Sequence, residues 1–216
     1  MRKFIDRIIP RYAQLPLILC GVTQFLAYFV TKYIHVCDYV DMTTCIDRMT
    51  PVQPAWVTVY IASYIYWIAG YIAVCRRSER NCRLLCRADY MAKLAAALCF
   101  VLMPTTITRP EMNGTGIFER LLWLIYYLDT PFNLFPSLHC LFSWLLAREL
   151  MDIKEFSPVI RWGAVIFSFM VFASTVFTAQ HVVADIAGGV ALAELARLCS
   201  HRLEKHNHKV EEGQAQ

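Results

Sequence analysis

The sequence has little charge and no segment that resembles a linker. Charged residues make up 18% of the 216 residues and hydrophobic residues make up 57%. A soluble domain usually carries about a quarter charged residues. Gly/Ser-rich linkers, low-complexity blocks and internal repeats are also lacking. The composition therefore disfavours a soluble protein and predicts one domain that uses lipid as its solvent.

Asp, Glu, Lys and Arg are missing altogether from four long stretches. These are residues 12–31, 54–75, 130–147 and 162–180. A membrane-spanning helix needs about 20 mainly apolar residues, and all four stretches reach a suitable length. Two weaker candidates are residues 94–108 and about 180–198. Because only helices satisfy every backbone group of short apolar segments in lipid, we predict an all-α integral membrane bundle of six helices.

The basic residues are distributed unevenly across this predicted topology. Six spans place the N-terminus, residues 76–93, residues 148–161 and the C-terminal tail on one side, with 17 of the 21 Lys and Arg residues. Such an excess marks the cytoplasmic side, so both termini are predicted to be cytoplasmic. The other side keeps Lys32, Arg48, Arg109 and Arg120.

The predicted topology also assigns the domain and its partners. Residues 1–202 form one domain embedded in the cell membrane, and residues 203–216 form a polar cytoplasmic tail. We attribute the net charge of +4 to basic residues that set the orientation in the membrane and contact anionic headgroups. No nucleic-acid partner is therefore expected. Residues 118–128 are predicted to form a short helix at the outer interface.

The nine cysteines give no clear metal-binding pattern. Cys75, Cys82 and Cys86 fall on the predicted cytoplasmic side, without the additional His or Cys partners that a zinc site would need. Cys37 and Cys45 both fall outside, where they are candidates for a disulfide whose geometry the sequence cannot establish. We therefore expect no metal site.

An acidic residue stands inside an apolar stretch near the C-terminal end. Asp185 follows His181 by four residues, so both side chains share one face of a helix. The carboxylate can hold one ring nitrogen of the histidine and leave the other as a nucleophile or base. Ionisable residues within spans are usually functional, although a hydrogen-bonded pair without chemistry explains the spacing equally well.

A second histidine and an arginine are predicted at the same membrane face. Pro136 and Ser137 suit the start of the helix that carries His139, and a helix N-terminus favours anions. Arg109 follows the third predicted span on the outer side. These groups and the His181 pair therefore predict a phosphate-ester site at the extracytoplasmic face.

Three short motifs resemble those of the type-2 phosphatidic-acid-phosphatase superfamily. They are Arg109-Pro110, Pro136-Ser-Leu-His139 and His181-x-x-x-Asp185. The resemblance is greatest to the branch that contains inositol-phosphorylceramide synthases and similar bacterial membrane proteins. That branch is indicated by Pro104-Thr-Thr, by the residues around His139 and His181, and by the upstream patch at residues 44–54.

The resemblance implies a role for each residue of these motifs. His181 would attack phosphorus to give a phosphohistidine, Asp185 would orient its ring, and His139 would protonate the leaving group. Arg109 would bind the phosphoryl oxygens, with backbone N–H groups near Ser137. Neither a metal nor another cofactor is implied.

Two positions depart from the family's pattern of cations. Leu102 and Thr175 stand where the family usually has a lysine and an arginine. Gln180, Arg120 and Asn133 are candidates to take over phosphate binding. The predicted function is hydrolysis of a lipid phosphate, with membrane lipids as the surroundings. A lipid phosphotransferase and a non-catalytic membrane scaffold of the same fold remain as alternatives.

Overall fold

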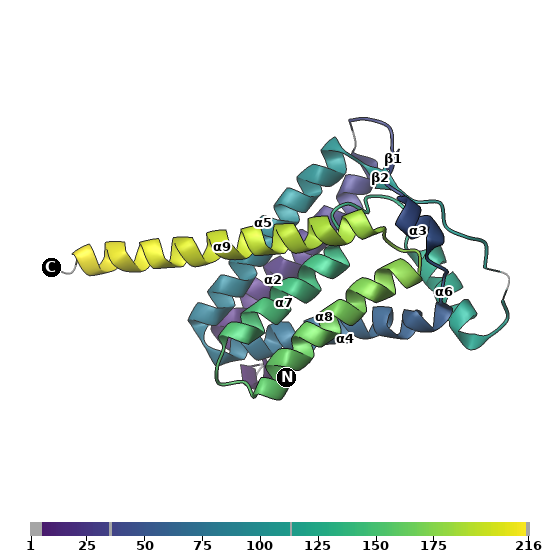
Figure 1. The fold of residues 1–216 in the computed structure, drawn as a ribbon. Coiled ribbons are helices and arrows are strands. Elements are labelled where there is room, and N and C mark those ends of the chain that lie inside the picture. Colours follow the sequence, from purple (N-terminus) through teal and green to yellow (C-terminus); the bar gives the residue numbers. More distant parts are fainter. Residues whose placement is uncertain (1–5, 35, 113, 215–216) are drawn as a thin grey trace.

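Six long helices pack side by side (Figure 1). The computed structural model describes residues 6–34, 36–112 and 114–214, and side chains up to residue 207. The long helices are α2 (Arg11–Phe25), α4 (Val57–Arg77), α5 (Glu79–Leu102), α7 (Leu138–Asp152), α8 (Pro158–Phe177) and α9 (Val183–Gln214). Helix α7 contacts α4, α5, α8 and α9, so it lies at the centre of the bundle.

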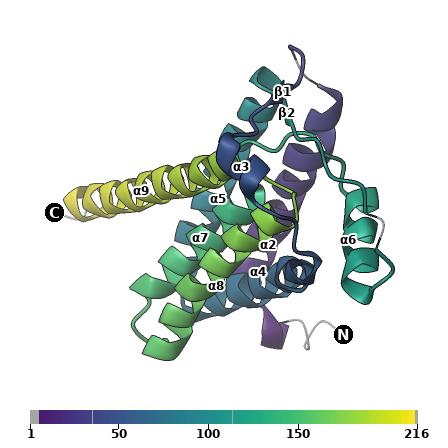
Figure 2. The same ribbon diagram turned by 45° about the vertical axis from the view of Figure 1, so that its right-hand side comes forward.

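Shorter elements gather at one end of this bundle (Figure 2). Helix α2 continues into a π turn, η1 (Leu26–Val30), and a 3-10 turn, η2 (Thr31–Tyr33). The others are β1 (Val40–Asp41), α3 (Cys45–Met49), η3 (Pro54–Trp56), β2 (Thr105–Thr106) and α6 (Ile117–Leu128). Strands β1 and β2 pair in parallel, with Val40 opposite Thr105.

Within the described residues, three segments are long and apolar enough to cross a membrane. They are Arg11–Tyr33, Pro54–Arg77 and Pro158–Phe177. Their exposed residues are largely Leu, Ile, Val, Phe and Tyr, which suits a lipid-facing surface. Helix α5 is long enough but begins with a polar half, and α7 has 15 residues. The chain is therefore a membrane protein, and the count of six spans remains a prediction.

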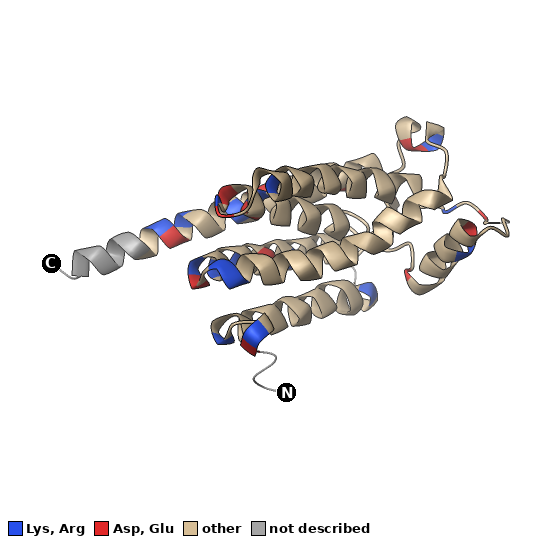
Figure 3. Ribbon diagram, turned by 90° about the horizontal axis from the view of Figure 1, so that it is seen from below, with Lys and Arg blue, Asp and Glu red and all other residues tan. Residues whose placement is uncertain are grey.

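Charge is concentrated at the ends of the bundle (Figure 3). Lys and Arg gather mainly at the end toward which both ends of the described chain point. The middle of the bundle shows almost no charged residue on its ribbon. This distribution agrees with the asymmetry of the basic residues in the sequence.

Several predicted boundaries differ from the observed ones. The third predicted span began at residue 94, whereas α5 begins at Glu79, because the Ser78 hydroxyl accepts a hydrogen bond from the Asn81 amide at 3.0 Å and caps the helix. The charge-free stretch from residue 130 turns helical only at Leu138. Helix α9 continues through the predicted tail to Gln214. The predicted short helix at 118–128 is confirmed as α6.

The candidate disulfide between Cys37 and Cys45 is not present. Cys45 is a free, exposed thiol. The Cys37 sulfur contacts the Leu102 carbonyl at 3.4 Å instead. Cys37 is therefore held against the C-terminal end of α5, away from a disulfide with α3.

Small residues let α9 lie directly on α7. A Cβ atom at Gly189 would stand 2.5 Å from the carbonyl oxygen of Ser137, and one at Gly188 would stand 2.4 Å from the Phe135 ring. Both distances are too short for a real contact. Glycine at these positions therefore allows the starts of α7 and α9 to meet, which small residues commonly allow between membrane helices.

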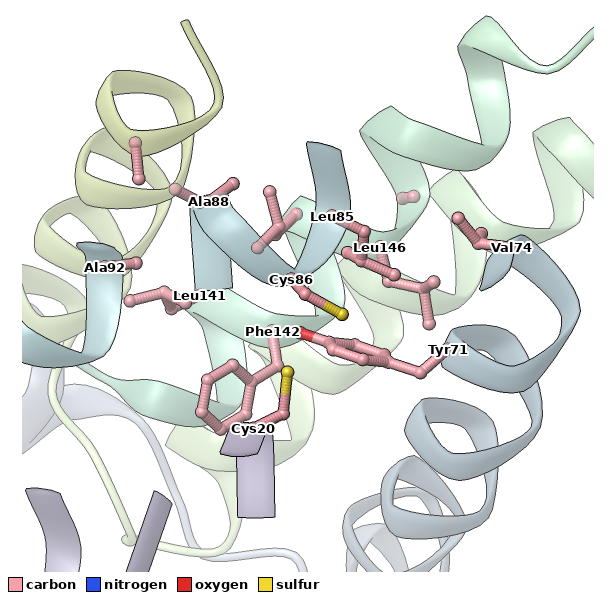
Figure 4. Close-up of a cluster of buried hydrophobic side chains, with 14 of the residues drawn as sticks. Cys20, Tyr71, Val74, Leu85, Cys86, Ala88, Ala92, Leu141, Phe142 and Leu146 are labelled. Atoms are coloured by element: carbon pink, nitrogen blue, oxygen red, sulfur yellow. The ribbon is translucent and has the colours of Figure 1, made fainter. Parts of the chain in front are cut away.

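The core between α2, α4, α5 and α7 mixes apolar and polar groups (Figure 4). Leu85, Leu141 and Leu146 are fully buried in it. Beside them, the Tyr71 hydroxyl donates to Asp89 at 2.7 Å, and Asp89 pairs with Lys93 at 2.6 Å. The two opposite charges and the tyrosine hydroxyl satisfy one another, as buried charges require.

Candidate active site

His181 and Asp185 form the pair that their spacing predicted. The Nδ1 atom of His181 lies 3.1 Å from Oδ2 of Asp185. Asp185 is fully buried and His181 is 8% exposed. With Nδ1–H donated to the carboxylate, the lone pair of the histidine is at Nε2, the atom that can attack an electrophile.

The connection between α8 and α9 fixes where His181 lies. Ala179 has a φ of 46°, a left-handed conformation that non-glycine residues seldom adopt. The amides of Gln180 and His181 both donate to the Thr175 carbonyl, at 2.9 and 3.0 Å. The chain therefore turns back over the end of α8, which places His181 two residues before the start of α9.

Carboxylates then secure the start of α9. Oδ2 of Asp185 accepts the amide of Val182 at 3.0 Å, and Oδ1 of Asp47 accepts the amide of Val183 at 2.9 Å. Asp47 also closes a capping box with Thr44 at the start of α3. The upstream patch at residues 44–54 thus supports the helix that carries the histidine–aspartate pair, as carboxylates do at helix N-termini.

Aromatic rings of α4 surround His139. Its ring stacks on Tyr60 with centroids 4.3 Å apart, and Trp67 meets it edge-on at 5.1 Å. The His139 Nε2 atom lies 3.3 Å from the Tyr64 hydroxyl. The three aromatic residues thus restrict the position of the imidazole through packing and one hydrogen bond.

The two histidines face the same space. Their ring centroids are 5.8 Å apart, at an angle of 56°. Both line a cavity of about 420 Å³ whose other walls are mostly apolar, including Tyr28, Phe29, Leu134 and Phe142. This volume falls within the range of small-molecule sites. Residues of α2, η1, α4, α6 and α7 and the segment before α9 therefore surround a space with two histidines on its wall.

Arg109 is held beside this space by three groups. Its guanidinium donates to the main-chain carbonyl of Asp129 and, at 2.5 Å, to Oε1 of Gln180. It also lies 4.7 Å from the centre of the Tyr126 ring. Gln180 directly precedes His181, so the arginine is tied to the residue next to the histidine.

Two buried N–H groups near Arg109 have no partner among the described residues. They are Nε of Arg109 and Nε2 of Gln180. Burial also lowers the pKa of the Arg109 guanidinium from its ordinary value, because desolvation disfavours the charged form. A phosphate bound here would provide acceptors for both groups and offset this desolvation.

Ser137 occupies the junction of α7 and α9. Its hydroxyl accepts the Cys140 amide at 3.3 Å and caps α7. Its own amide donates to the Asp185 carbonyl at 3.0 Å. The amides that remain at the start of α7 are those of Leu138 and His139, which have no intrahelical acceptor at the first two helical positions.

The two positions that lack the family's cations lie in different surroundings. Leu102 is 55% exposed at the end of α5. Thr175 is fully buried, and its carbonyl accepts the amides of Gln180 and His181. Thr175 therefore shapes the turn that carries His181, whereas Leu102 faces outward.

Sequence reasoning missed several residues near the site. The Tyr60 hydroxyl donates to Oδ2 of Asp129 at 3.3 Å, and Lys32 lies 4.0 Å from the centre of the Tyr28 ring on the cavity wall. The spacing of Tyr60, Tyr64 and Trp67 puts three aromatic residues on one helical face. That spacing is a signal from which the aromatic wall could have been found.

The hydroxyl of Thr105 explains why the Pro104-Thr-Thr motif matters. It accepts the amides of Leu134 and Phe135, at 3.0 and 2.8 Å. The Thr105 carbonyl accepts the amide of Asn133, whose φ is 57°. The segment that precedes α7 is thereby fixed to β2, and with it the approach to His139.

The fold and this site define a helical membrane protein with a histidine–aspartate pair and an arginine around an apolar cavity. The family model of the PAP2 superfamily matches residues 41–199, which is most of the chain, and the chain belongs to that superfamily. Its members are phosphatases. Comparison with curated proteins and with solved structures found no significant match.

Proposed function

We propose that this protein hydrolyses a phosphate ester of a lipid at the extracytoplasmic face of the membrane. Membership of the PAP2 superfamily supports a lipid phosphoesterase activity. The observation that carries the proposal is the placement of the His181–Asp185 pair and His139 on one cavity wall, with ring centroids 5.8 Å apart.

In the first step, Nε2 of His181 attacks the phosphorus atom of the substrate. The bond from phosphorus to the lipid oxygen breaks, and His139 gives its proton to that oxygen as it leaves. Asp185 stabilises the positive charge on the His181 ring, because its Oδ2 faces Nδ1 at 3.1 Å. The products of this step are the dephosphorylated lipid and a phosphohistidine.

In the second step, water attacks the phosphohistidine. His139, now neutral, accepts a proton from the water, and the bond from phosphorus to Nε2 breaks. Inorganic phosphate leaves and both histidines return to their first state. One histidine thus acts as nucleophile and the other as acid and then base, the division of roles that different surroundings make possible.

Arg109 and Gln180 bind the phosphoryl group during both steps. Their unpartnered Nε and Nε2 atoms supply two donors, and the guanidinium supplies the positive charge. Preorganised donors of this kind favour the more highly charged transition state. Ser137 and the first amides of α7 complete the phosphate site.

The cavity and the charge distribution support the substrate class and the side of the membrane. Most of the cavity wall is apolar, which suits the chain-bearing part of a lipid. The site lies at the end of the bundle opposite the main gathering of Lys and Arg (Figure 3), and basic residues mark the cytoplasmic side.

A phosphotransferase is the second candidate, and the observation that favours it is the reduced positive charge at the site. Leu102 and Thr175 replace two family cations, and Arg109 is held by neutral groups and one ring. A phosphodiester carries less charge than a phosphomonoester and needs fewer cations. An alcohol acceptor would then take the place of water in the second step.

Phosphate release from purified protein tests the proposal. Protein in mixed micelles is supplied with a panel of lipid phosphates in the presence of EDTA. We expect release by the wild type and by His206→Ala, which changes an exposed histidine on α9, and none by His181→Ala. A wild type that releases phosphate from no lipid contradicts hydrolysis, and new headgroup products from diacyl donors would identify a transferase.

A further inference from the structure

Three cysteines from α4 and α5 meet away from the active site. The sulfur atoms of Cys75, Cys82 and Cys86 all lie within 4.8 Å of one another. Those of Cys82 and Cys86 are 4.0 Å apart. Each of the three residues is at most 1% exposed. Among the described residues, no other group of three His, Cys, Asp or Glu ligands meets this distance.

The sharp connection between α4 and α5 creates this cluster. Helix α4 ends at Arg77 and α5 begins at Glu79, with Ser78 between them as the cap. Cys82 and Cys86 are four residues apart and share one face of α5. The reversal at Ser78 brings that face against Cys75 in the last turn of α4. Nothing in the spacing of these cysteines showed that they lie together, because only the reversal at Ser78 makes Cys75 a neighbour of the other two.

The distances suit a metal ion bound by thiolates. With metal–sulfur bonds of about 2.3 Å, two sulfurs of a tetrahedral zinc site lie about 3.8 Å apart. The observed separation of 4.0 Å for Cys82 and Cys86 is close to this value. Thiolates also select soft cations over magnesium or calcium. The cluster therefore has the ligand type of a zinc site and, between Cys82 and Cys86, its spacing, while the other two separations are no more than 4.8 Å.

We propose that Cys75, Cys82 and Cys86 bind one Zn²⁺ ion. Binding forms three Zn–S bonds and releases three protons, one from each thiol, so no oxidant or reductant is needed. The sulfur of Cys20, on α2, points toward that of Cys86 (Figure 4), which places a further soft atom beside the group. The bound ion fastens the end of α4 to the start of α5.

The position of the cluster assigns the ion a structural role. Cys75 follows Tyr60, which packs on His139, by about four turns of α4, or about 22 Å along the helix. The zinc site therefore does not depend on the proposed phosphatase chemistry.

Zinc content of the purified protein tests the proposal. The full chain is purified in detergent, incubated with Zn²⁺, dialysed and analysed by elemental mass spectrometry. We expect about one zinc per chain in the wild type and in Cys99→Ser, a control on the same helix outside the cluster, and none above background in Cys82→Ser. A wild type without retained zinc, or equal retention by Cys82→Ser, overturns the proposal.

Alkylation of the wild type provides a test that needs no variant. Zinc should protect Cys75, Cys82 and Cys86 from a maleimide reagent in mildly denaturing detergent, as peptide mass spectrometry would show. Protection should weaken as the pH falls, because protons compete with the metal for the thiolates. Equal alkylation of the three cysteines with and without Zn²⁺ overturns the proposal.

Discussion

The main-chain amide of Ser137 donates a hydrogen bond to the main-chain carbonyl of Asp185 at 3.0 Å. This bond joins the start of α7 to the start of α9, two segments that are almost 50 residues apart in the sequence. His139 follows one partner by two residues, and His181 precedes the other by four. The relative position of the two histidines is therefore set by main-chain contact between their helices.

Replacing Asp185 with asparagine tests how the nucleophile is oriented. Asp185→Asn keeps the side-chain size but removes the charge that stabilises a protonated His181 ring. We expect kcat for phosphate release to fall by about 10²- to 10⁴-fold, as when the aspartate of a serine-protease triad is replaced, with a smaller change in KM. Glu194→Gln is the control, since Glu194 is on the same helix but pairs with Trp144 and Arg148. An unchanged kcat in Asp185→Asn would show that the pair has no part in the chemistry.

The contact of α9 with α7 predicts a strong effect at Gly189. In Gly189→Ala the new methyl group would stand 2.5 Å from the Ser137 carbonyl oxygen, so the helices must separate. Overpacking of this kind costs about 1–3 kcal/mol, and we expect a lower melting temperature together with lost activity. Gly163→Ala is the control, because nothing lies within 4 Å of its Cβ position. Equal behaviour of the two variants in thermal unfolding would contradict the close approach.

Changing Arg109 to lysine separates charge from geometry. Arg109→Lys keeps the positive charge but cannot contact Gln180, the Asp129 carbonyl and a phosphate together, because lysine lacks the planar fork of donors. We expect kcat/KM to fall by about 10- to 100-fold, corresponding to the loss of one or two charge-assisted hydrogen bonds. Arg48→Lys, at an exposed position on α3, should leave kcat/KM unchanged. A wild-type value in Arg109→Lys would argue that the guanidinium does not bind the phosphate.

The carboxyl group of Asp129 predicts a pH dependence of stability. Burial raises the pKa of Asp129 from 3.8 to about 6. The folded protein thus holds this proton more tightly than the unfolded chain, so stability is lost as the pH rises from about 4 through 6. Asp129→Asn should remove that loss, which thermal unfolding at several pH values would show as a flatter dependence.

A second aspartate provides the control for this experiment. The Thr43 hydroxyl and amide hold the pKa of Asp41 below its ordinary value. Its contribution to stability is therefore present above pH 4 and lost only as the pH falls further. Asp41→Asn should leave the dependence between pH 4 and 6 unchanged. If Asp129→Asn behaves in the same way, the Asp129 carboxyl is not the group that titrates.

Local patterns in the sequence were sufficient for three of the long helices and for one pair of candidate site residues. Charge-free stretches of about 20 residues predicted α2, α4 and α8, because the length and hydropathy of a membrane span can be recognised without knowing which helices it packs against. The i, i+4 spacing predicted the contact of His181 with Asp185, but not its form. His181 lies just before α9 rather than on it, and the Asp185 carboxylate reaches back to it over the start of the helix. The charge-free stretch placed the start of this span at residue 130, whereas α7 begins at Leu138. No pattern showed that Thr105 would bind the amides of residues 133–135 and keep them out of the helix.

Contacts between distant segments could not be predicted from the same patterns. The aromatic wall around His139 comes from α4, the carboxylate that caps α9 comes from α3, and Gln180 reaches Arg109 across 71 residues. Each depends on how helices turn and pack, which a single sequence does not display.

The sequence by itself determined that this chain is a helical membrane protein, which residue types are available for phosphate chemistry, and that His181 lies beside Asp185. It could do so because hydropathy and helical spacing are local properties. Only the tertiary structure decided that His139 and His181 lie together on the wall of one cavity and that three cysteines meet between α4 and α5. The distances between the cysteines depend on the reversal at Ser78, and the distance between the histidines depends on the close approach of α9 to α7 at Gly189. Both are set by backbone geometry and by packing between separate segments of the chain.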